Sequence, residues 1–331
     1  MSRGPWWESP ILQSIVPVVA GSRLVATNEA AIATVARWMA HEEFHFPQGS
    51  ILGPFELDVA PATVIDVGMF TGALNFAFTD FDTGQKYEVD YLGKRWSDTE
   101  AMFARVHRAV LAGEPILTGE WMAAVTVADL EGLFGDSLPM LSERAAILNA
   151  VGATLCDRYQ GSFHRFFKDC RPAMYADGDG LLERMTAEFP RFRDVSVFDG
   201  TEAQFYKLGQ LSLWLLHIAL HASGDFALED LHRMTALADY IVPVALEVMG
   251  ITEYAPQLAA AIAGGEMIER DSAQEIEIRA HTLYATALLT DAINEIRPTG
   301  SQLIVPQVDY RLWKAYHATF RPHHLTRTTM Y

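Results

Sequence analysis

Most of the sequence after residue 97 repeats apolar residues at the spacing of an α-helix, and this pattern constrains the fold more than any other feature. Glycine, proline and capping residues divide the pattern into segments of helical length. We therefore predict a mainly α fold with one small antiparallel sheet (α+β). Besides a helix that opens near residue 97, the predicted helices lie at about 126–134, 141–158, 180–188, 203–222, 228–250, 256–263, 273–296 and 309–317.

The small sheet is predicted from two alternating segments in the N-terminal third. Leu74-Asn-Phe-Ala-Phe78 and Lys86-Tyr-Glu-Val-Asp-Tyr91 both alternate apolar and polar residues, and Asp82-Thr-Gly84 between them is typical of a turn. We expect a β-hairpin at about 74–91, within a stretch of strand character that starts near Val64. The helical body then begins at about residue 97.

The first residues predict an arm that is anchored by aromatic side chains. Trp6 and Trp7 are suited to pack residues 1–25 against the body, and Asn28 is suited to cap a helix that runs towards Pro47. We find no repeat or low-complexity linker after the arm. Residues 26–331 are therefore predicted to form a single domain.

Composition limits the partners and the compartment. The 331 residues carry a formal net charge of −17, which disfavours binding to DNA or RNA because affinity for a polyanion comes largely from lysine and arginine. Cys156 and Cys170 are too few for a disulfide framework. No apolar run reaches transmembrane length, and the N-terminal residues lack the apolar core of a signal peptide. We predict a cytoplasmic protein without membrane segments.

The segment from Leu228 to Pro243 places an acidic residue where a helix must stop. Apolar residues recur at helical spacing from Leu228 onward, and Pro243 cannot donate to the carbonyl of Asp239, four residues earlier. A second helix is predicted from Pro243 to Gly250. Spacing alone favours a polar position at the edge of a kinked helix for Asp239, although a carboxylate at a helix end can also face a cleft.

The letters His41-Glu-Glu-Phe-His45 match a zinc-peptidase motif, in which two histidines one turn apart bind zinc. Pro47 follows directly and disfavours helix at Phe46. No third histidine stands at the spacing that the longer form of the motif requires. A polar helix end is the better interpretation, and no metal site is predicted.

Two polar groups on predicted helices have both a structural and a functional interpretation. Lys207 follows two aromatic residues on an otherwise apolar helix, where it lies on a solvated face or points into a cleft to bind a phosphate or carboxylate. Glu275 and Arg279 have the spacing of a helix-stabilising pair. The tail, residues 323–331, is expected to fray as chain ends commonly do.

Several blocks taken together resemble the queuosine salvage proteins, the queuosine 5′-phosphate N-glycosylase/hydrolase family. Their order and spacing match over about residues 64–331. The blocks are Leu74-Asn-Phe-Ala-Phe78, Arg193-Asp-Val-Ser-Val-Phe-Asp-Gly200, Phe205-Tyr-Lys-Leu-Gly-Gln210, Ala238-Asp-Tyr-Ile-Val-Pro243, Gly265-Glu-Met267, Glu275-Ile-Glu-Ile-Arg279, Asp309-Tyr-Arg-Leu-Trp313 and the tail that ends in Tyr331.

This resemblance implies a helical fold similar to the helix-hairpin-helix DNA glycosylases. It implies hydrolysis of queuosine 5′-monophosphate, a small nucleotide, to queuine and ribose 5-phosphate, without a cofactor. Asp239 aligns with the catalytic aspartate of the family and Lys207 with a lysine of a neighbouring motif. Cleavage of an N-glycosidic bond develops positive charge at C1′, which a carboxylate stabilises or attacks.

A deazaguanine base needs a stacking surface and polar anchors in a concave pocket. The stacking candidates are Phe76, Phe78, Tyr240 and Trp313, and the polar candidates are Asn75 and Asp309. Because side chains alternate along a strand, the two phenylalanines would share one face and Asn75 the other. For the 5′-phosphate the candidates are Lys207 and either His324 or Arg327 of the tail.

Two other functions compete with the hydrolase. The implied fold would suit a DNA-repair-type glycosylase, which the charge of −17 and the lack of a Gly-hydrophobic-Gly hairpin oppose. A non-catalytic carrier of queuine or nucleotides would bind the same ligand with Asp239 dispensable. The oligomeric state is not predicted.

Overall fold

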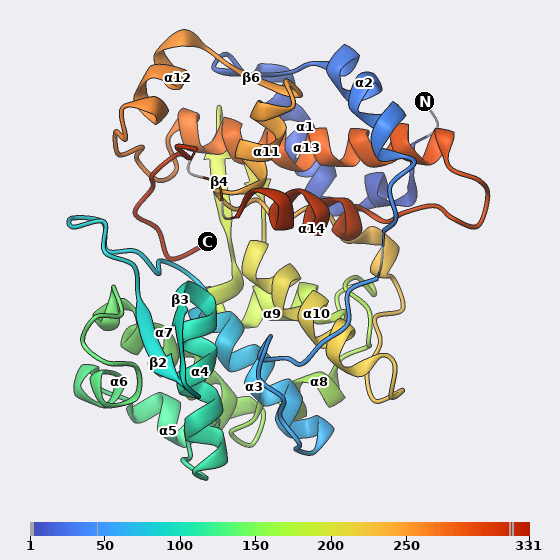
Figure 1. Ribbon diagram of the computed structural model, residues 1–331. Helices are drawn as coiled ribbons and strands as arrows, with labels where there is room; N and C mark the ends of the chain where they lie inside the picture. Colours follow the sequence, from blue (N-terminus) through green and yellow to red (C-terminus); the bar gives the residue numbers. More distant parts are fainter. Residues whose placement is uncertain (1–2, 45, 318, 320) are drawn as a thin grey trace.

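The computed structural model describes residues 3–44, 46–317, 319 and 321–331. The described chain is mainly helical with short antiparallel strands, as predicted (Figure 1). Its helices are α1 (Pro10–Gly21), α2 (Glu29–Met39), α3 (Pro61–Leu74), α4 (Asp98–Leu111), α5 (Gly119–Ala124), α6 (Val127–Phe134), α7 (Leu141–Arg158), α8 (Phe163–Asp169), α9 (Leu181–Glu188), α10 (Lys207–Leu220), α11 (Val242–Val248), α12 (Pro256–Ala263), α13 (Ala273–Ile296) and α14 (Val305–Tyr316). Single 3-10 turns are η1 (Pro5–Glu8), η2 (Pro190–Phe192) and η3 (Leu231–Arg233). The strands are β1 (Val25–Thr27), β2 (Glu88–Tyr91), β3 (Lys94–Ser97), β4 (Val195–Phe198), β5 (Thr201–Gln204) and β6 (Thr252–Tyr254).

Helices with clear local signals were predicted best. The Ser272 side chain accepts from the N–H of Glu275 to start α13, and Thr126 and Asp129 form a reciprocal capping box at α6. Asn28 caps α2 as expected, although α2 ends at Met39, well before Pro47. The predicted helices that are confirmed to within two residues are α6, α7, α9, α12 and α13, and α4 spans the helix expected from residue 97.

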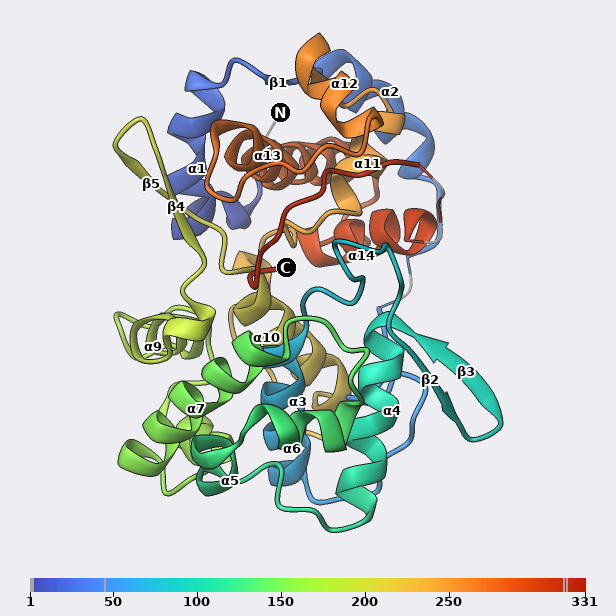
Figure 2. The same ribbon diagram turned by 90° about the vertical axis from the view of Figure 1, so that its left-hand side faces the viewer.

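The helices form two groups that lie one above the other in Figure 1, and Figure 2 shows the same division from the side. One group contains α1, α2 and α11 to α14, and the other contains α3 to α10. One continuous apolar cluster includes side chains of both groups, such as Ile15 of α1 and Phe70 of α3. The C-terminus lies between the groups in both views. The boundary between the groups is therefore the place where distant segments of the chain meet.

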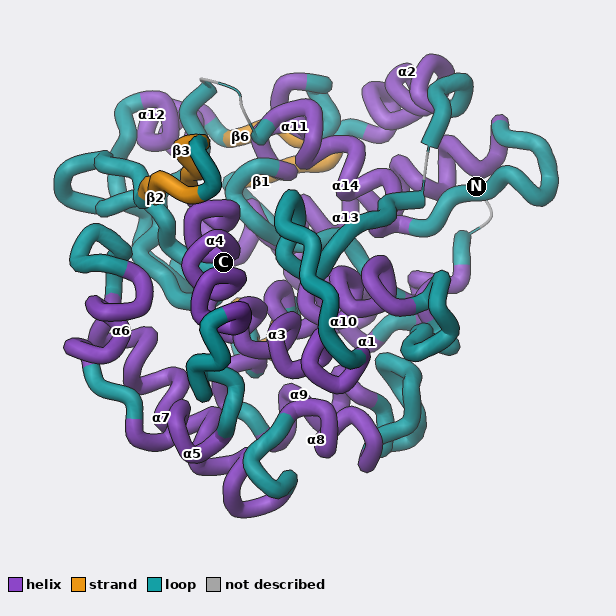
Figure 3. Tube along the Cα trace, turned by 60° about the horizontal axis from the view of Figure 1, so that its bottom comes forward, coloured by secondary structure: helices purple, strands orange, loops and turns teal. Residues whose placement is uncertain are grey.

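Three separate two-stranded sheets replace the single sheet that was expected. β1 pairs with β6, β2 with β3, and β4 with β5, all antiparallel. Figure 3 shows how little of the chain is strand, since helices and loops make up nearly all of the trace. The β4–β5 hairpin packs against α1 and therefore belongs with the group that contains α1. The helices that flank the hairpin in sequence, α9 and α10, belong to the other group.

The hairpin predicted at about 74–91 is shifted along the chain. Residues from Val64 to Leu74 belong to α3, a helix whose last turns are buried on all sides. A segment that is apolar all round gives neither the helical nor the strand period, which explains the wrong prediction. The turn at 80–84 is present, with one bridge between Thr79 and Lys86, but the ladder forms between β2 and β3 around Gly93.

The prediction of a helix from Leu228 to Pro243 is also wrong. Only η3 is helical there, and residues 234–240 run without regular structure to α11. The second predicted helix is confirmed as α11, with Pro243 in its first turn, where a missing N–H costs no hydrogen bond. Asp239 therefore precedes a helix start rather than marking a break within a helix.

The described residues near both ends of the chain pack against the body. Trp6 and Trp7 are buried as predicted, and the Nε1 of Trp7 donates to Asp291 Oδ2 over 2.7 Å. Residues 10–21 within the arm form α1, which packs along α13. The tail was expected to fray, yet Tyr331 is only 6% exposed. Of the helices in the described ranges, none combines the length and apolar character needed to cross a bilayer.

Candidate active site

The loop Thr235–Tyr240 is held by side chains from three other segments. The Oε1 of Gln210 accepts from the N–H of Thr235 at 3.0 Å, and Asp309 Oδ1 accepts from the N–H of Leu237 at 2.9 Å. The Nε of Arg279 donates to the carbonyl oxygen of Ala238 at 3.3 Å. These bonds satisfy backbone groups that a helix would have paired internally, which explains why the segment is stable as a loop.

The Asp239 side chain lies near the end of this loop and accepts hydrogen bonds from backbone N–H groups two and three residues further along the chain. Its Oδ1 accepts from the N–H of Ile241 at 2.8 Å and of Val242 at 2.9 Å. Oδ2 accepts no hydrogen bond from any residue that the structure describes. The side chain is buried, and this burial raises the pKa of Asp239, while the charge of Lys207 and the two N–H donors lower it.

Lys207 is the first residue of α10 and faces the same region from the other helical group. Tyr206 before it adopts a left-handed conformation with φ 47°, which turns the chain sharply into the helix. Burial lowers the pKa of Lys207, and the charge of Asp239 opposes that change. Among ion pairs shorter than 4 Å in the described ranges, none includes Lys207. The ammonium and the carboxylate thus interact at a range longer than a direct ion pair.

Asp309 is the third buried ionisable group at this boundary. Its Oδ1 binds Leu237, and its Oδ2 has no partner in the described part of the chain. Burial raises the pKa of Asp309 well above its usual range, and the nearby charge of Asp239 raises it further. Asp239 Oδ2, Lys207 Nζ and Asp309 Oδ2 are thus polar atoms of three electrostatically interacting side chains, and none has a hydrogen-bond partner among the described residues.

A buried ion pair lies behind these groups. Arg279 Nη1 and Nη2 donate to Asp194 Oδ1 and Oδ2 at 2.9 and 2.5 Å, and Nη1 lies 3.5 Å from Glu275 Oε1. The predicted Glu275–Arg279 pair is therefore present, but in the core. The guanidinium carbon lies 4.0 and 4.6 Å from the ring centroids of Phe205 and Tyr331. The tail is ordered because it covers this pair.

The four stacking candidates occupy different environments. The Tyr240 ring packs against the His323 ring at 4.6 Å and lies near the Asp239 carboxylate, which helps to raise its pKa. Trp313 is 37% exposed and stacks on His317 at 4.6 Å. Phe76 is fully buried between two arginines, a position that favours a structural role over contact with a ligand. Phe78 is also buried. The arginines are Arg144 and Arg191, with guanidinium carbons 4.1 and 4.8 Å from the Phe76 centroid.

The remaining predicted contacts also differ in environment. Asn75 ends α3, is half-buried, and accepts from the Thr99 hydroxyl at 3.2 Å. His324 is buried, its Nε2 lies 3.3 Å from the Tyr331 hydroxyl, and burial lowers its pKa to about 3. A neutral His324 brings no positive charge to a phosphate. Arg327 is exposed and lies 3.4 Å from Asp82 Oδ2.

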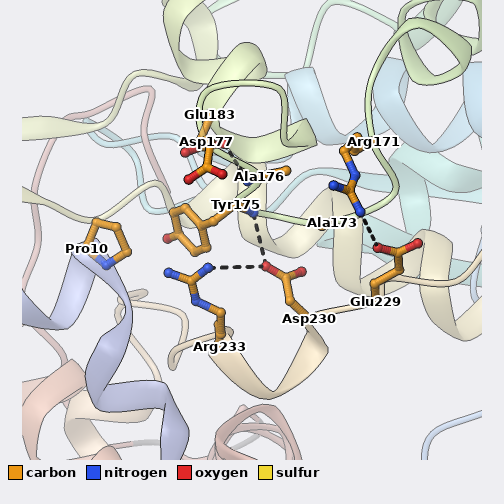
Figure 4. A pocket seen from close by; sticks show the side chains of 10 residues that line it. All are labelled: Pro10, Arg171, Ala173, Tyr175, Ala176, Asp177, Glu183, Glu229, Asp230 and Arg233. Carbon is orange, nitrogen blue, oxygen red and sulfur yellow. Dashed lines mark hydrogen bonds and ion pairs between the residues drawn. The ribbon is translucent and has the colours of Figure 1, made fainter.

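Two cavities differ in their relation to this site. The larger, about 430 Å³, is lined by Pro10, Tyr175 and charged side chains that pair with one another, such as Arg171 with Glu229 and Arg233 with Asp230 (Figure 4). None of the predicted site residues lines it. The smaller, about 190 Å³, is lined by Pro243 and Val244 of α11 and by His323 and His324. It therefore adjoins α11, which starts three residues after Asp239.

The zinc interpretation gains no support. His45 lies outside the described residues, and Glu42 binds Arg311 through two 2.8 Å hydrogen bonds. No group of three metal-binding side chains occurs among the described residues.

Sequence reasoning missed the site roles of Asp194, Gln210, Thr235 and His323. Asp194 and Gln210 lie within the blocks that resemble the family, and this resemblance could have indicated their roles. Thr235 and His323 have no distinctive spacing in the sequence.

The fold and these groups define a class, namely a mainly helical protein with a buried acid–lysine centre between two groups of helices. The chain belongs to the queuosine salvage protein family, whose profile matches residues 58–331. It is 34% identical over 264 residues to the queuosine 5′-phosphate N-glycosylase/hydrolase of Sphaerobacter thermophilus, covering 78% of this chain and 79% of that protein. Proteins with the same name from Bos taurus (29% identical; 73% of each chain) and Schizosaccharomyces pombe (26%; 92% and 90%) are also similar.

Proposed function

We propose that this protein hydrolyses the N-glycosidic bond of queuosine 5′-monophosphate and releases queuine for salvage. The observation that carries the proposal is the group of three buried, electrostatically interacting side chains, Asp239, Lys207 and Asp309, each with a polar atom that has no hydrogen-bond partner among the described residues. Perturbed ionisable groups that face one another in this way are typical of catalytic sites. The names of the related proteins supply the substrate.

Asp239 is the catalytic carboxylate in this proposal. As the bond to the base breaks, positive charge develops at C1′ and the ring oxygen, and the free Oδ2 either stabilises that charge or bonds to C1′. Both routes require the ionised form. Lys207 and the N–H groups of Ile241 and Val242 favour that form against the effect of burial. Water then completes the hydrolysis to ribose 5-phosphate.

The other predicted residues are assigned to the substrate by their environment. Lys207 supplies charge for the 5′-phosphate, and Arg327 is a further candidate for charge, whereas neutral His324 could contribute only a hydrogen bond. Asp309 and Asn75 contact the polar edge of the base, and Asp309 in its neutral form can donate as well as accept. Tyr240 and Trp313 are the stacking candidates with a half-buried or exposed ring, which favours them over Phe76 and Phe78.

The wider context follows from the family and from charge. We infer a helical arrangement similar to helix-hairpin-helix DNA glycosylases, an arm of residues 1–25 before a single catalytic domain of residues 26–331, and a cytoplasmic location. The substrate is a free nucleotide rather than a nucleic acid, since a net charge of −17 repels a polyanion. No cofactor is needed for this reaction.

The test is the release of free queuine from queuosine 5′-monophosphate, followed by mass spectrometry. The wild-type protein should release queuine, and Asp239→Asn should bind the nucleotide without releasing queuine. Binding without release by the wild type would instead identify a carrier. Equal release by both proteins would remove Asp239 from the mechanism.

A further inference from the structure

The Asp194–Arg279 ion pair is bonded to the backbone on both sides of the candidate site. Asp194 Oδ2 accepts from the backbone N–H of Lys207 at 3.3 Å as well as from Arg279. On the other side, Arg279 Nε donates to the carbonyl oxygen of Ala238, the residue before Asp239. One buried pair thus contacts the backbone that carries the lysine and the backbone that carries the carboxylate.

We propose that Asp194 and Arg279 are positioning residues that fix the separation between the Lys207 ammonium and the Asp239 carboxylate. This inference rests on the proposed hydrolase function and deepens it. Neither residue is assigned a contact with substrate, because each of the three guanidinium nitrogens of Arg279 already has a partner. Nη1 and Nη2 bind Asp194, Nη1 also faces Glu275, and Nε binds Ala238.

The geometry of the pair suits this role. A bidentate arginine–carboxylate contact fixes orientation as well as distance. The rings of Phe205 and Tyr331 both pack against the guanidinium and restrict its movement further. A buried ion pair is weak evidence for stability, since well-packed apolar residues commonly serve as well. Stability alone therefore does not account for a charged pair at this position.

The charges around Asp239 set its pKa, so a change in the Asp194–Arg279 pair that moves Lys207 should be detected as a change in that pKa. Lys207 from α10 and His323 from the tail lower the pKa of Asp239. Asp309 from α14 and the Tyr240 side chain are coupled to the same carboxylate. If Lys207 moves away, the charge that favours ionised Asp239 weakens, and the pKa of Asp239 rises. The acid limb of the activity profile should then move to higher pH.

Arg279→Lys tests the proposal because it keeps the positive charge but loses the bidentate contact and the bond to Ala238. We expect kcat to fall by about ten- to a hundredfold, the effect of a small misplacement of catalytic groups. KM should change less than kcat, since Lys207 is the only proposed phosphate contact that the variant displaces. The acid limb of kcat/KM against pH should shift upward. Queuine release across a pH series provides all three quantities.

Glu277→Gln is the matched control, on the same helix. Glu277 is equally buried, and its Oε2 accepts from the N–H groups of Arg23, Leu24 and Val25, away from the site. This variant should lower the melting temperature and leave the acid limb where it is. If Arg279 has a purely structural role, Arg279→Lys and Glu277→Gln should both lower the stability and leave the acid limb of kcat/KM unchanged. That result would overturn the proposal.

Asp194→Asn gives an independent version of the test, because it keeps the shape of the side chain and weakens the pair from the other end. It should change kcat and the acid limb in the same direction as Arg279→Lys. Failure of both variants to fold would overturn a positioning role in favour of a structural one. An inactive wild-type protein would refute the hydrolase function itself, which separates the two failures.

Discussion

The backbone N–H of Leu237 donates to Asp309 Oδ1 over 2.9 Å, and this bond ties the loop that carries Asp239 to helix α14. It brings two buried carboxyl groups together from segments about seventy residues apart. Burial raises the pKa of both groups, but Lys207 and two backbone donors limit the rise at Asp239, whereas the charge of Asp239 raises the pKa of Asp309 further. Carboxyl groups whose environments separate their pKa values in this way can take different roles in one reaction.

Asp309→Asn should make stability less dependent on pH. The pKa of Asp309 is higher in the folded than in the unfolded protein, so the folded state binds more protons between the two pKa values. The free energy of unfolding therefore falls as pH rises through that window. Asparagine keeps the acceptor for Leu237 and removes this decline. Urea unfolding from acidic to neutral pH measures it, and identical pH slopes in both proteins would contradict the raised pKa.

Asp239→Asn should abolish most of the activity without disturbing the fold. The asparagine Oδ1 can still accept from Ile241 and Val242, so the start of α11 is retained. Loss of the negative charge should slow queuine release by on the order of a thousandfold, the range found for electrostatic and acid–base groups. Release is measured by mass spectrometry and nucleotide binding by calorimetry. Loss of binding together with activity would point to a collapsed site.

Lys207→Ala should change both specificity and pH dependence. The ammonium lowers the pKa of Asp239, so its removal raises that pKa and moves the acid limb of kcat/KM to higher pH. The preference for the monophosphate over the free nucleoside should also fall. Rates with both substrates across a pH series provide the measurement. An unchanged preference combined with a shifted limb would restrict Lys207 to an electrostatic role towards Asp239.

How far the sequence predicted the fold depended on whether the signals were local. Helices such as α13 have a cap, a period and an end within one segment, and these were predicted correctly. The loop before Asp239 was missed because its partners, Gln210, Asp309 and Arg279, lie far away in the chain. Its buried residues, including Met234 and Ala238, fit helical spacing as well as they fit a loop that is buried on several sides.

The candidate site shows the same division between local and distant information. Asp239 and Lys207 were predicted as site residues because the blocks around them resemble a family, whereas periodicity alone favoured a structural role for both. The Asp194–Arg279 pair joins residues eighty-five positions apart. No spacing rule predicts such a contact. The tail was expected to fray because nothing near Tyr331 in the sequence shows that Arg279 lies beneath its ring.

Tyr331 provides a final test, since it separates an ordered tail from a frayed one. Its ring covers the guanidinium of Arg279, and its hydroxyl lies 3.3 Å from His324 Nε2. Tyr331→Ala should lower the free energy of unfolding by about 3 kcal/mol, as for a buried aromatic side chain. Tyr331→Phe removes only the hydroxyl contact and should cost about 1 kcal/mol. Urea unfolding of both variants measures the difference, and a wild-type value for Tyr331→Ala would show that the tail does not pack on Arg279 in solution.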